Sequence, residues 1–357
     1  MALTAAPSDT TSITPTLVRL ADGQTLSRDE AAELLDHVML GAVSPVQAAG
    51  AFTALRVRGE TVDEITGFAQ TMRRHATPVK LSPGPAVVDT CGTGGDGSGS
   101  FNVSTTAAFV AAGAGLRVAK HGNRSASSRC GSADVLEGLG ARITLSPEDV
   151  AACVEASGFA FMFAQAYHPA MRHVQPIRRE LGFRTIFNLL GPLTNPAGAP
   201  RQVIGVGDRV AARKMVDVLA NLDCERVWIV TSADGLDELT LAGPNAVCEF
   251  DCRSGGVREW MLDPADFGLG RVESAALAGG DVAENVSITR SVLAGERGPR
   301  RDTVVLNAAA AIVVGGLAGD LAEGLDRART AIDDGSAGAS LDAFVAASLV
   351  THASGVR

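Results

Sequence analysis

The segment Ala86-Val-Val-Asp-Thr-Cys-Gly-Thr-Gly-Gly-Asp-Gly-Ser-Gly-Ser100 decides how this chain folds. Its apolar start predicts a short buried strand over 86–88, and the apolar residues of 103–114 predict a helix after it. Between them, five glycines fall within the eight residues 92–99. Glycine lets backbone N–H groups approach a ligand closely, and a helix N-terminus attracts negative charge. The order of strand, glycine-rich turn and helix therefore predicts an anion site at the turn.

A cationic stretch follows this turn in a chain that is acidic overall. The net charge is −9, yet no Asp or Glu lies between Asp96 and Asp134. That stretch contains Arg117, Lys120, His121, Arg124 and Arg129. Local positive charge beside a glycine-rich turn favours a specific phosphate site. The overall acidity argues against a general binder of nucleic acid or of an anionic membrane.

The composition is that of an ordinary enzyme of one large domain, or of a large and a small one. Hydrophobic residues make up 46% of the 357 residues. No apolar run reaches the length of a membrane span, and residues 1–14 lack the features of a signal peptide. We expect a disordered tail over 1–14, a cytoplasmic location, and no membrane or nucleic-acid partner. Six scattered cysteines indicate reduced thiols. Cys248 and Cys252 have the spacing of a metal half-site, but the missing second pair argues against a metal there.

The N-terminal region carries three successive signals for the start of a helix. Ser27-Arg-Asp-Glu30, Ser44-Pro-Val-Gln47 and Thr61-Val-Asp-Glu64 each place a hydroxyl three residues before Glu or Gln, as in a capping box. Apolar residues recur at helical spacing after each signal. We expect a small helical domain over 15–82, completed by helices within 169–190.

Strands alternate with helices in the remaining chain, 83–357. Apolar runs predict further strands over 116–119, 159–164, 201–206 and 226–231. This alternation indicates a large α/β domain with a mostly parallel sheet flanked by helices. In such sheets, ligands bind beyond the carboxyl ends of the strands. We therefore expect the glycine turn and the segment Lys120–Arg124 to lie on one rim of the sheet.

Two familiar phosphate-binding patterns do not fit the glycine turn. Gly92-Thr-Gly-Gly-Asp-Gly97 satisfies the dinucleotide fingerprint, but Lys120 stands where an acidic residue should bind the ribose hydroxyls. The Walker pattern fails because Ser98-Gly99 replaces the required lysine and hydroxyl residue. A tight surface turn without a ligand is the remaining alternative, although so many glycines then cost backbone entropy without a gain.

A second cluster of hydrogen-bond donors is Lys120-His-Gly-Asn-Arg-Ser-Ala-Ser-Ser128. Its hydroxyls, amide and cations suit phosphate and ribose oxygens, and we expect it to form a loop after a strand. Lys120 and Arg124 are the candidate catalytic cations, acting through their charge. His121, beside two cations, is expected to orient the loop rather than to act as a base.

A third motif, Asp234-Gly-Leu-Asp-Glu-Leu-Thr240, follows the predicted strand 226–231. Asp237 and Glu238 offer hard oxygen ligands, and Mg²⁺ commonly takes one or two carboxylates together with waters and substrate phosphates. The alternative is a polar turn with solvated acids. Beside a phosphate site, the pair predicts Mg²⁺ as a cofactor.

Taken in order, these motifs resemble the anthranilate phosphoribosyltransferase family. The resemblance rests on the segments Gly92–Asp96, Asn102–Thr105, Lys120–Arg124, Ala133–Glu137, His168–Pro169, Arg178–Gly182, Asn188–Pro196 and Asp237–Glu238. It implies a homodimer of two-domain subunits, similar in fold to the pyrimidine nucleoside phosphorylases. It also implies transfer of a phosphoribosyl group from phosphoribosyl pyrophosphate to the amine of anthranilate, in tryptophan biosynthesis and with Mg²⁺. Met171 departs from relatives that carry an aromatic residue at its position.

The resemblance also implies roles for individual residues. The phosphoribosyl donor would be bound by Gly92, Gly95, Asp96, Ser100, Asn102, Val103, Ser104, Thr105, Lys120, His121, Gly122, Asn123, Arg124, Ser125, Ala126, Ser127, Ser128 and Ser132. Mg²⁺ would be bound by Ser104, Asp237 and Glu238. Anthranilate would be bound by Gly92, Asn123, His168 and Arg178, with the Arg178 guanidinium facing the carboxylate of the acceptor.

Two other functions stay open at this point. A nucleoside phosphorylase on the same fold would use phosphate as the nucleophile, and base release from pyrimidine nucleosides would reveal it. A non-catalytic nucleic-acid-binding relative would use the basic loops on phosphates. The net charge and the pair Asp237-Glu238 argue against this second alternative.

Overall fold

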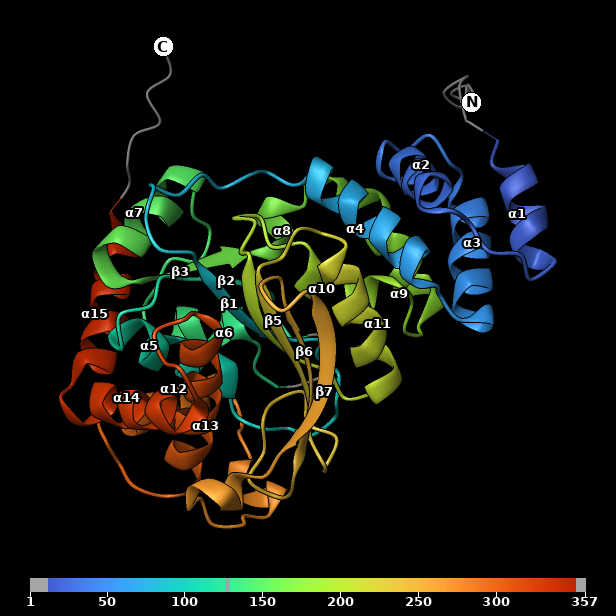
Figure 1. Cartoon of the computed structure of the whole chain (residues 1–357). Helices are drawn as coiled ribbons and strands as arrows, with labels where there is room; N and C mark the ends of the chain where they lie inside the picture. The colour runs from blue at the N-terminus through green and yellow to red at the C-terminus, as the bar shows by residue number, and fades with distance from the viewer. Residues whose placement is uncertain (1–11, 126–128, 351–357) are drawn as a thin grey trace. The chain divides into compact units, whose positions relative to one another are not determined.

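The computed structural model describes residues 12–125 and 129–350, which form two compact units (Figure 1). The helical unit consists of the described residues of Met1–Thr77 together with His168–Thr194. The α/β unit consists of those of Pro78–Tyr167 and Asn195–Arg357. The segment His168–Thr194 thus groups with the N-terminal helices, although a long stretch of the α/β unit separates them in the sequence.

The helical unit is built from short helices. Its elements are α1 (Thr14–Ala21), α2 (Arg28–Met39), α3 (Pro45–Arg58), α4 (Val62–His75), η1 (Pro169–His173), α9 (Gln175–Leu181) and α10 (Phe187–Leu193). Of these, α2, α3 and α4 begin at a side-chain cap. Ser27 and Thr61 form the predicted capping boxes with Glu30 and Glu64, which confirms the starts of α2 and α4. The prediction missed α1, which begins at Thr14, the last residue of the expected tail.

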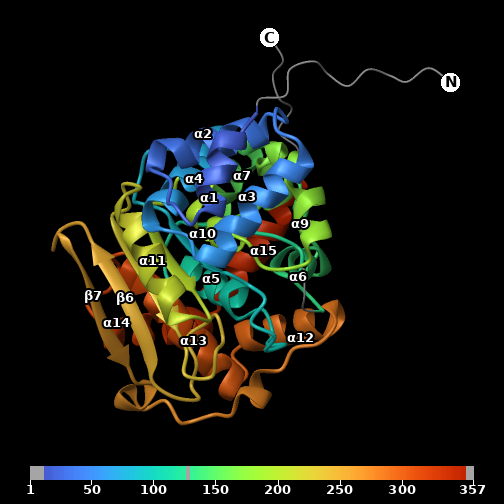
Figure 2. The same ribbon diagram turned by 90° about the vertical axis from the view of Figure 1, so that its right-hand side faces the viewer.

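The α/β unit is organised around one seven-stranded sheet of order β3-β2-β1-β4-β5-β6-β7. The strands are β1 (Val88–Gly92), β2 (Val118–Gly122), β3 (Phe159–Phe163), β4 (Arg201–Gly205), β5 (Arg226–Thr231), β6 (Asn245–Asp251) and β7 (Gly256–Leu262). The first five strands in this order are mutually parallel. β6 then pairs antiparallel with β5, and β7 pairs antiparallel with β6. Figure 2 shows this unpredicted pair at one edge of the sheet.

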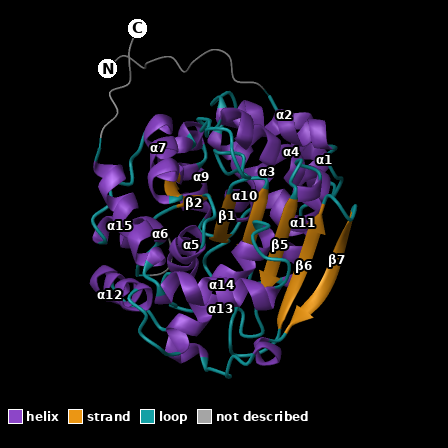
Figure 3. Cartoon of the chain, turned by 60° about the vertical axis from the view of Figure 1, so that its left-hand side comes forward, coloured by secondary structure: helices purple, strands orange, loops and turns teal. Residues whose placement is uncertain are grey.

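Helices flank the sheet, as the sequence predicted (Figure 3). They are α5 (Val103–Gly113), α6 (Ser132–Gly138), α7 (Pro147–Ser157), α8 (Ala164–Tyr167), α11 (Arg209–Ala220), α12 (Val282–Leu293), α13 (Pro299–Val314), α14 (Leu321–Asp333) and α15 (Ser336–Leu349), with the 3₁₀ turns η2 (Pro264–Phe267) and η3 (Ser274–Leu277). The alanine-rich helices α5 and α13 pack against each other and against β1. Small side chains allow this close approach, so the core supports the start of α5 rigidly.

The strand β2 lies further along the chain than predicted, because it covers Val118–Gly122 instead of 116–119. Lys120, His121 and Gly122 therefore belong to a strand and not to the loop after it.

Within residues 12–125 and 129–350, no helix has the length and apolarity needed to cross a membrane.

Candidate active site

The glycine turn leaves the sheet at its topological switch point. β1 pairs with β2 on one side and with β4 on the other, and the chain returns to β4 only after β3. The turn then runs through Gly94, Gly95, Gly97 and Gly99, whose φ angles of 70°, 72°, 72° and 64° lie in the region that favours glycine. Ligands of open α/β sheets bind at such a point.

The motif after β5 packs onto this turn. The Gly94 N–H donates to Asp237 Oδ2 at 2.6 Å. A Cβ added to Gly92 would lie 2.7 Å from Asp237 Cγ, and one added to Gly205 would lie 3.0 Å from Asp237 Cα. The first contact is shorter than real Cβ contacts, and a Cβ at Gly205 would also overlap the Asp237 carbonyl group. Glycine at the ends of β1 and β4 therefore makes room for Asp237. Gly205 was not among the predicted site residues, although Gly205-Val-Gly207 at the end of a predicted strand was a visible signal.

The carboxylates near the turn repel one another. Glu238 Oε1 accepts the Ser104 N–H at 3.0 Å, and Asp96 Oδ2 accepts the Asp237 N–H at 3.4 Å. Burial raises the pKa of Asp237, and the Asp96 carboxylate raises it further. Burial raises the pKa of Glu238 as well, with an added contribution from Asp237. A cation at this point would relieve the repulsion between the carboxylates.

Lys120 reaches the same place from β2. Its side chain is buried, and its ammonium group donates to the Thr90 carbonyl and, at 3.3 Å, to Ser104 Oγ. The prediction that Lys120 lies in a loop was thus wrong. Lys120 lies inside the sheet because the strand continues to Gly122, and its ammonium group is already bonded to protein oxygens.

Arg124 lies in the loop after β2 and pairs with carboxylates of α6. Its guanidinium contacts Asp134 at 2.7 Å and Glu137 at 2.5 Å, and it lies 5.6 Å from the centre of the Phe163 ring. Glu137 and Asp134 raise the pKa of Arg124. In this structure Arg124 is therefore paired with Asp134 and Glu137, the first acidic residues after the acid-free stretch of the sequence.

The other predicted donor contacts fall into three groups. Ser100 Oγ contacts Ser98 Oγ at 3.2 Å, and Asn102 Nδ2 donates to the Cys130 carbonyl at 3.3 Å. Asn123, whose Oδ1 accepts the Arg124 N–H at 2.8 Å, is held to α6 through the Ser132 hydroxyl, which donates to the Asn123 carbonyl at 3.1 Å. The side chains of Val103, Thr105 and His121 are buried. Ala126, Ser127 and Ser128 lie outside the described residues.

The two predicted acceptor residues that follow β3 belong to the helical unit. Arg178, on α9, is half-buried, and its guanidinium lies 5.7 Å from the centre of the Phe187 ring. Burial lowers the pKa of Arg178. Its neighbour Arg179 is exposed. His168 is buried at the start of η1, and burial lowers its pKa to about 4.

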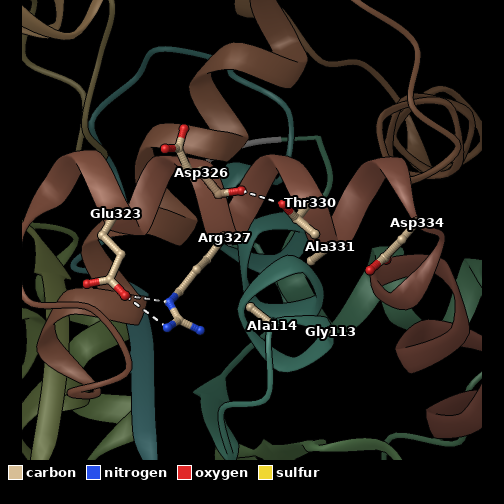
Figure 4. A pocket seen from close by; sticks show the side chains of 8 residues that line it. All are labelled: Gly113, Ala114, Glu323, Asp326, Arg327, Thr330, Ala331 and Asp334. Carbon is tan, nitrogen blue, oxygen red and sulfur yellow. Dashed lines mark hydrogen bonds and ion pairs between the residues drawn. The ribbon is translucent and has the colours of Figure 1, made fainter.

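A surface pocket of about 400 Å³ lies elsewhere in the α/β unit, between the end of α5 and α14 (Figure 4). Its lining includes Glu323, Asp326, Arg327 and Asp334, with Glu323 and Arg327 paired at 2.9 Å. None of the predicted site residues lines it. The pocket is a groove between solvated helix faces and not the site described above.

Two family models match the chain in agreement with its two units. They are described as the α/β domain of a glycosyl transferase family, matched over residues 84–338, and the helical bundle domain of a glycosyl transferase family, matched over residues 14–76. Fold and site therefore define a glycosyl transferase of this two-domain class. This confirms the predicted fold of a small helical domain with a large α/β domain.

Named relatives specify the class further. The chain is 54% identical to an anthranilate phosphoribosyltransferase of Pelotomaculum thermopropionicum over 92% of its length and 94% of the relative's. A solved anthranilate phosphoribosyltransferase of Thermus thermophilus matches with a TM-score of 0.88 and 45% identity, over 94% of this chain and 99% of that one. The chain belongs to the anthranilate phosphoribosyltransferase family, which confirms the enzyme class predicted from the sequence.

A more distant structure carries ligands. The anthranilate phosphoribosyltransferase of Saccharomyces cerevisiae, solved in complex with PRPP and Mg, matches with a TM-score of 0.85 and 28% identity, over 94% of this chain and 98% of that one. The same yeast enzyme has also been solved in complex with 4-fluoroanthranilate. The yeast complexes support Mg²⁺ as the cofactor of the family.

Proposed function

We propose that this chain transfers the phosphoribosyl group of phosphoribosyl pyrophosphate to the amine of anthranilate, as a step of tryptophan biosynthesis. The products are N-(5-phosphoribosyl)anthranilate and pyrophosphate. One observation carries the proposal: Ser104, Lys120, Asp237 and Glu238 meet beside the glycine turn, in a chain of this family. These residues come from three separate segments of the sequence, and together they suit a metal-bound polyphosphate.

The residues around the turn fit Mg²⁺ by the chemistry of their oxygens. Asp237 and Glu238 supply carboxylates and Ser104 a hydroxyl, and burial together with repulsion from neighbouring carboxylates raises the pKa of both acids. In the described residues, no three His, Cys, Asp or Glu side chains form a ready metal cage. We assign Ser104, Asp237 and Glu238 to hold the ion, which supplies positive charge to the leaving pyrophosphate when bound.

The donor is assigned to the glycine turn, the start of α5 and the loop after β2. Gly92, Gly95, Asp96, Ser100 and Asn102 to Thr105 would contact it from the first two segments. Lys120 to Ser128 with Ser132 would contact it from the end of β2, the loop after it and α6. Val103 and Thr105 have buried side chains, so their contribution is through backbone groups. Arg124 is paired with Asp134 and Glu137 here, so a phosphate must displace or share those carboxylates.

The reaction requires little acid–base chemistry from these residues. An aromatic amine is neutral and nucleophilic at pH 7, so attack on the anomeric carbon of the ribose needs no strong base. Charge grows instead on the departing pyrophosphate, and fixed donors aimed at that charge stabilise the transition state. We assign this role to Lys120, Arg124 and the turn N–H groups, which bind and orient the leaving group while the acceptor amine is held in line.

We assign the acceptor to Gly92, Asn123, His168 and Arg178. The half-buried guanidinium of Arg178 has lost hydration and lies against an aromatic ring. A planar carboxylate suits such a guanidinium, because two parallel hydrogen bonds can form.

The decisive experiment follows the fluorescence of anthranilate in the presence of this protein. We expect consumption that requires both phosphoribosyl pyrophosphate and Mg²⁺. Base release from pyrimidine nucleosides in the presence of phosphate, without consumption of anthranilate, would instead assign the chain to a nucleoside phosphorylase. Loss of neither substrate would contradict the proposed reaction.

We also propose that the chain forms a homodimer in the cytoplasm. Five large apolar side chains of the helical unit are solvent-exposed, namely Val18, Leu40, Val46, Val57 and Phe183. Val46 and Val57 expose 81% and 82% of their surface, which favours burial against a second copy. All six cysteines are free thiols, as expected in a reducing compartment. Light scattering should give twice the chain mass, and Val46→Lys should shift the equilibrium toward the monomer.

A further inference from the structure

The strands β1 and β2 part soon after they begin to pair. β1 pairs with β4 over five residues, and β2 pairs with β3 over five. Between β1 and β2, both fully described, the parallel register includes one pair only, Val88 with Val118. The carboxyl ends of these two strands are therefore not joined by a regular backbone ladder, although they carry the glycine turn and Lys120.

Side chains bridge this gap in place of the ladder. Asp89 Oδ1 accepts the His121 N–H at 3.2 Å, and Asp89 Oδ2 accepts from Asn195 Nδ2 at 2.7 Å. The same Asn195 nitrogen donates to the Ala119 carbonyl at 2.9 Å. From the opposite strand, the Lys120 ammonium group donates to the Thr90 carbonyl. We call Asp89, Asn195 and Lys120 with these hydrogen bonds the bridge. The bridge connects β1 to β2, directly or through Asn195, and so fixes the separation of the two strands.

The bridge is buried and contains one acid and one base. Asp89 has no exposed surface, while Asn195 and Lys120 expose only 4% and 2% of theirs. A buried carboxylate is destabilising unless it is paired and hydrogen-bonded, and Lys120 supplies the nearby positive charge. The mechanism assigned above gives Asp89 and Asn195 no contact with either substrate.

The Lys120 ammonium group connects the bridge to the candidate active site. Its ammonium group is 3.3 Å from Ser104 Oγ, the hydroxyl assigned to Mg²⁺. We propose that Asp89 and Asn195 are positioning residues, which hold β2 at the distance from β1 that lets Lys120 orient the Ser104 hydroxyl toward the donor and its metal. This inference rests on the proposed function and deepens it. It adds two residues that act through Lys120 and do not touch substrate.

The test uses Asp89→Asn in the full chain. The new amide can still accept the His121 N–H, but its nitrogen faces the Asn195 nitrogen, and the charge opposite Lys120 is lost. We expect donor affinity, measured calorimetrically with Mg²⁺, to weaken by about tenfold or more, as for other groups that orient metal ligands. The kcat should fall with it, while the KM for anthranilate should stay within about twofold of wild type.

Two further variants make the outcome decisive. Asn195→Ala keeps the charge and removes the bridge to Ala119, so it should shift donor affinity in the same direction, and it decides the question if Asp89→Asn does not fold. Ser340→Ala is the control, because it removes a buried hydrogen bond of 2.8 Å to the Ser157 carbonyl elsewhere in the α/β unit. It should lower Tm without changing any kinetic constant.

Unchanged donor affinity and kcat in a folded bridge variant would overturn the inference. So would an equal loss of donor affinity in Ser340→Ala at an equal loss of Tm, because the effect would then be one of general stability. Absence of turnover in the wild-type protein would count against the proposed function itself, and is distinguishable from both.

Discussion

The α/β unit and the helical unit hold their candidate cations in different ways. Lys120 in the α/β unit is bonded to Thr90 and Ser104, and Arg124 is paired with two acids of α6. Arg178 in the helical unit is half-buried against a ring, and no carboxylate among the described residues pairs with it. Lys120 and Arg124 are therefore already part of the protein's own bonding, whereas Arg178 is desolvated without such a partner.

This difference separates two kinds of mutational effect. Removing a cation that also joins structural elements should reduce stability, donor binding and turnover together. Removing a guanidinium that only meets a ligand should reduce binding of that ligand and little else. The predictions below test this contrast, beginning with the carboxylates that face the donor-side cations.

Replacing both Asp237 and Glu238 by Ala should have the largest effect. Single groups that stabilise developing charge are each worth about 10²–10³ in rate, so we expect turnover to fall on the order of 10⁴-fold at saturating Mg²⁺. Circular dichroism should show an intact fold. A matched control removes Glu323 and Asp326, two acids of the pocket in Figure 4, and should leave kcat unchanged. Wild-type turnover in the first double variant would remove both acids from the metal site.

Lys120→Ala should affect stability and activity together. The substitution removes the ammonium hydrogen bond to the Thr90 carbonyl and leaves Asp89 buried without its nearby cation, and a hydrogen bond to a charged group is worth about 1.5–3 kcal/mol. Urea unfolding measures this loss, and steady-state kinetics should show weaker donor binding with a lower kcat. Arg124→Ala, which removes exposed ion pairs, should change the free energy of unfolding by only about 0–1 kcal/mol. If Lys120→Ala altered only the KM for anthranilate, Lys120 would belong to acceptor binding.

Arg178→Ala should weaken anthranilate binding by about 2–3 kcal/mol, which is the typical loss of a charge-assisted hydrogen-bonded pair. Donor affinity should change little, because this guanidinium is not part of the donor-side bonding. Arg179 is the internal control, since it is adjacent in sequence, points elsewhere on the helix and is exposed. Separate titrations of the two substrates measure both effects. Equal, small changes in both variants would leave Arg178 without a role in acceptor binding.

Local signals in the sequence were sufficient to predict much of the fold and part of the site. The caps at Ser27 and Thr61 act within one helical turn, and the glycine turn depends on residues next to one another. Asp237 and Glu238 were found because two adjacent acids after a strand are a visible pattern. Each of these features depends on neighbours in the chain, so the sequence displays them directly.

Features that depend on distant partners were not predictable in the same way. Asn195 and Asp89 are 106 positions apart, and nothing local shows that they meet. Arg124 stood out because acids are absent before Asp134, yet Asp134 and Glu137 of α6 are its partners in the structure. The hairpin β6–β7 was missed because its edge strand β7 is mostly solvent-exposed and lacks the apolar run of a buried strand.

The smallest predicted effect concerns stability and pH in the helical unit. Burial lowers the pKa of His168 to about 4, whereas an unfolded histidine titrates near 6.5. Between these values the unfolded chain binds the proton and the folded chain does not. The stability contributed by neutral His168 is therefore present above about pH 6.5 and is lost as the pH falls toward 4. Urea unfolding without substrates should show a loss on the order of 2 kcal/mol over this interval, and His168→Gln should reduce that slope. An identical slope in the variant would show that another group causes it, and that His168 becomes protonated in the folded protein at ordinary pH.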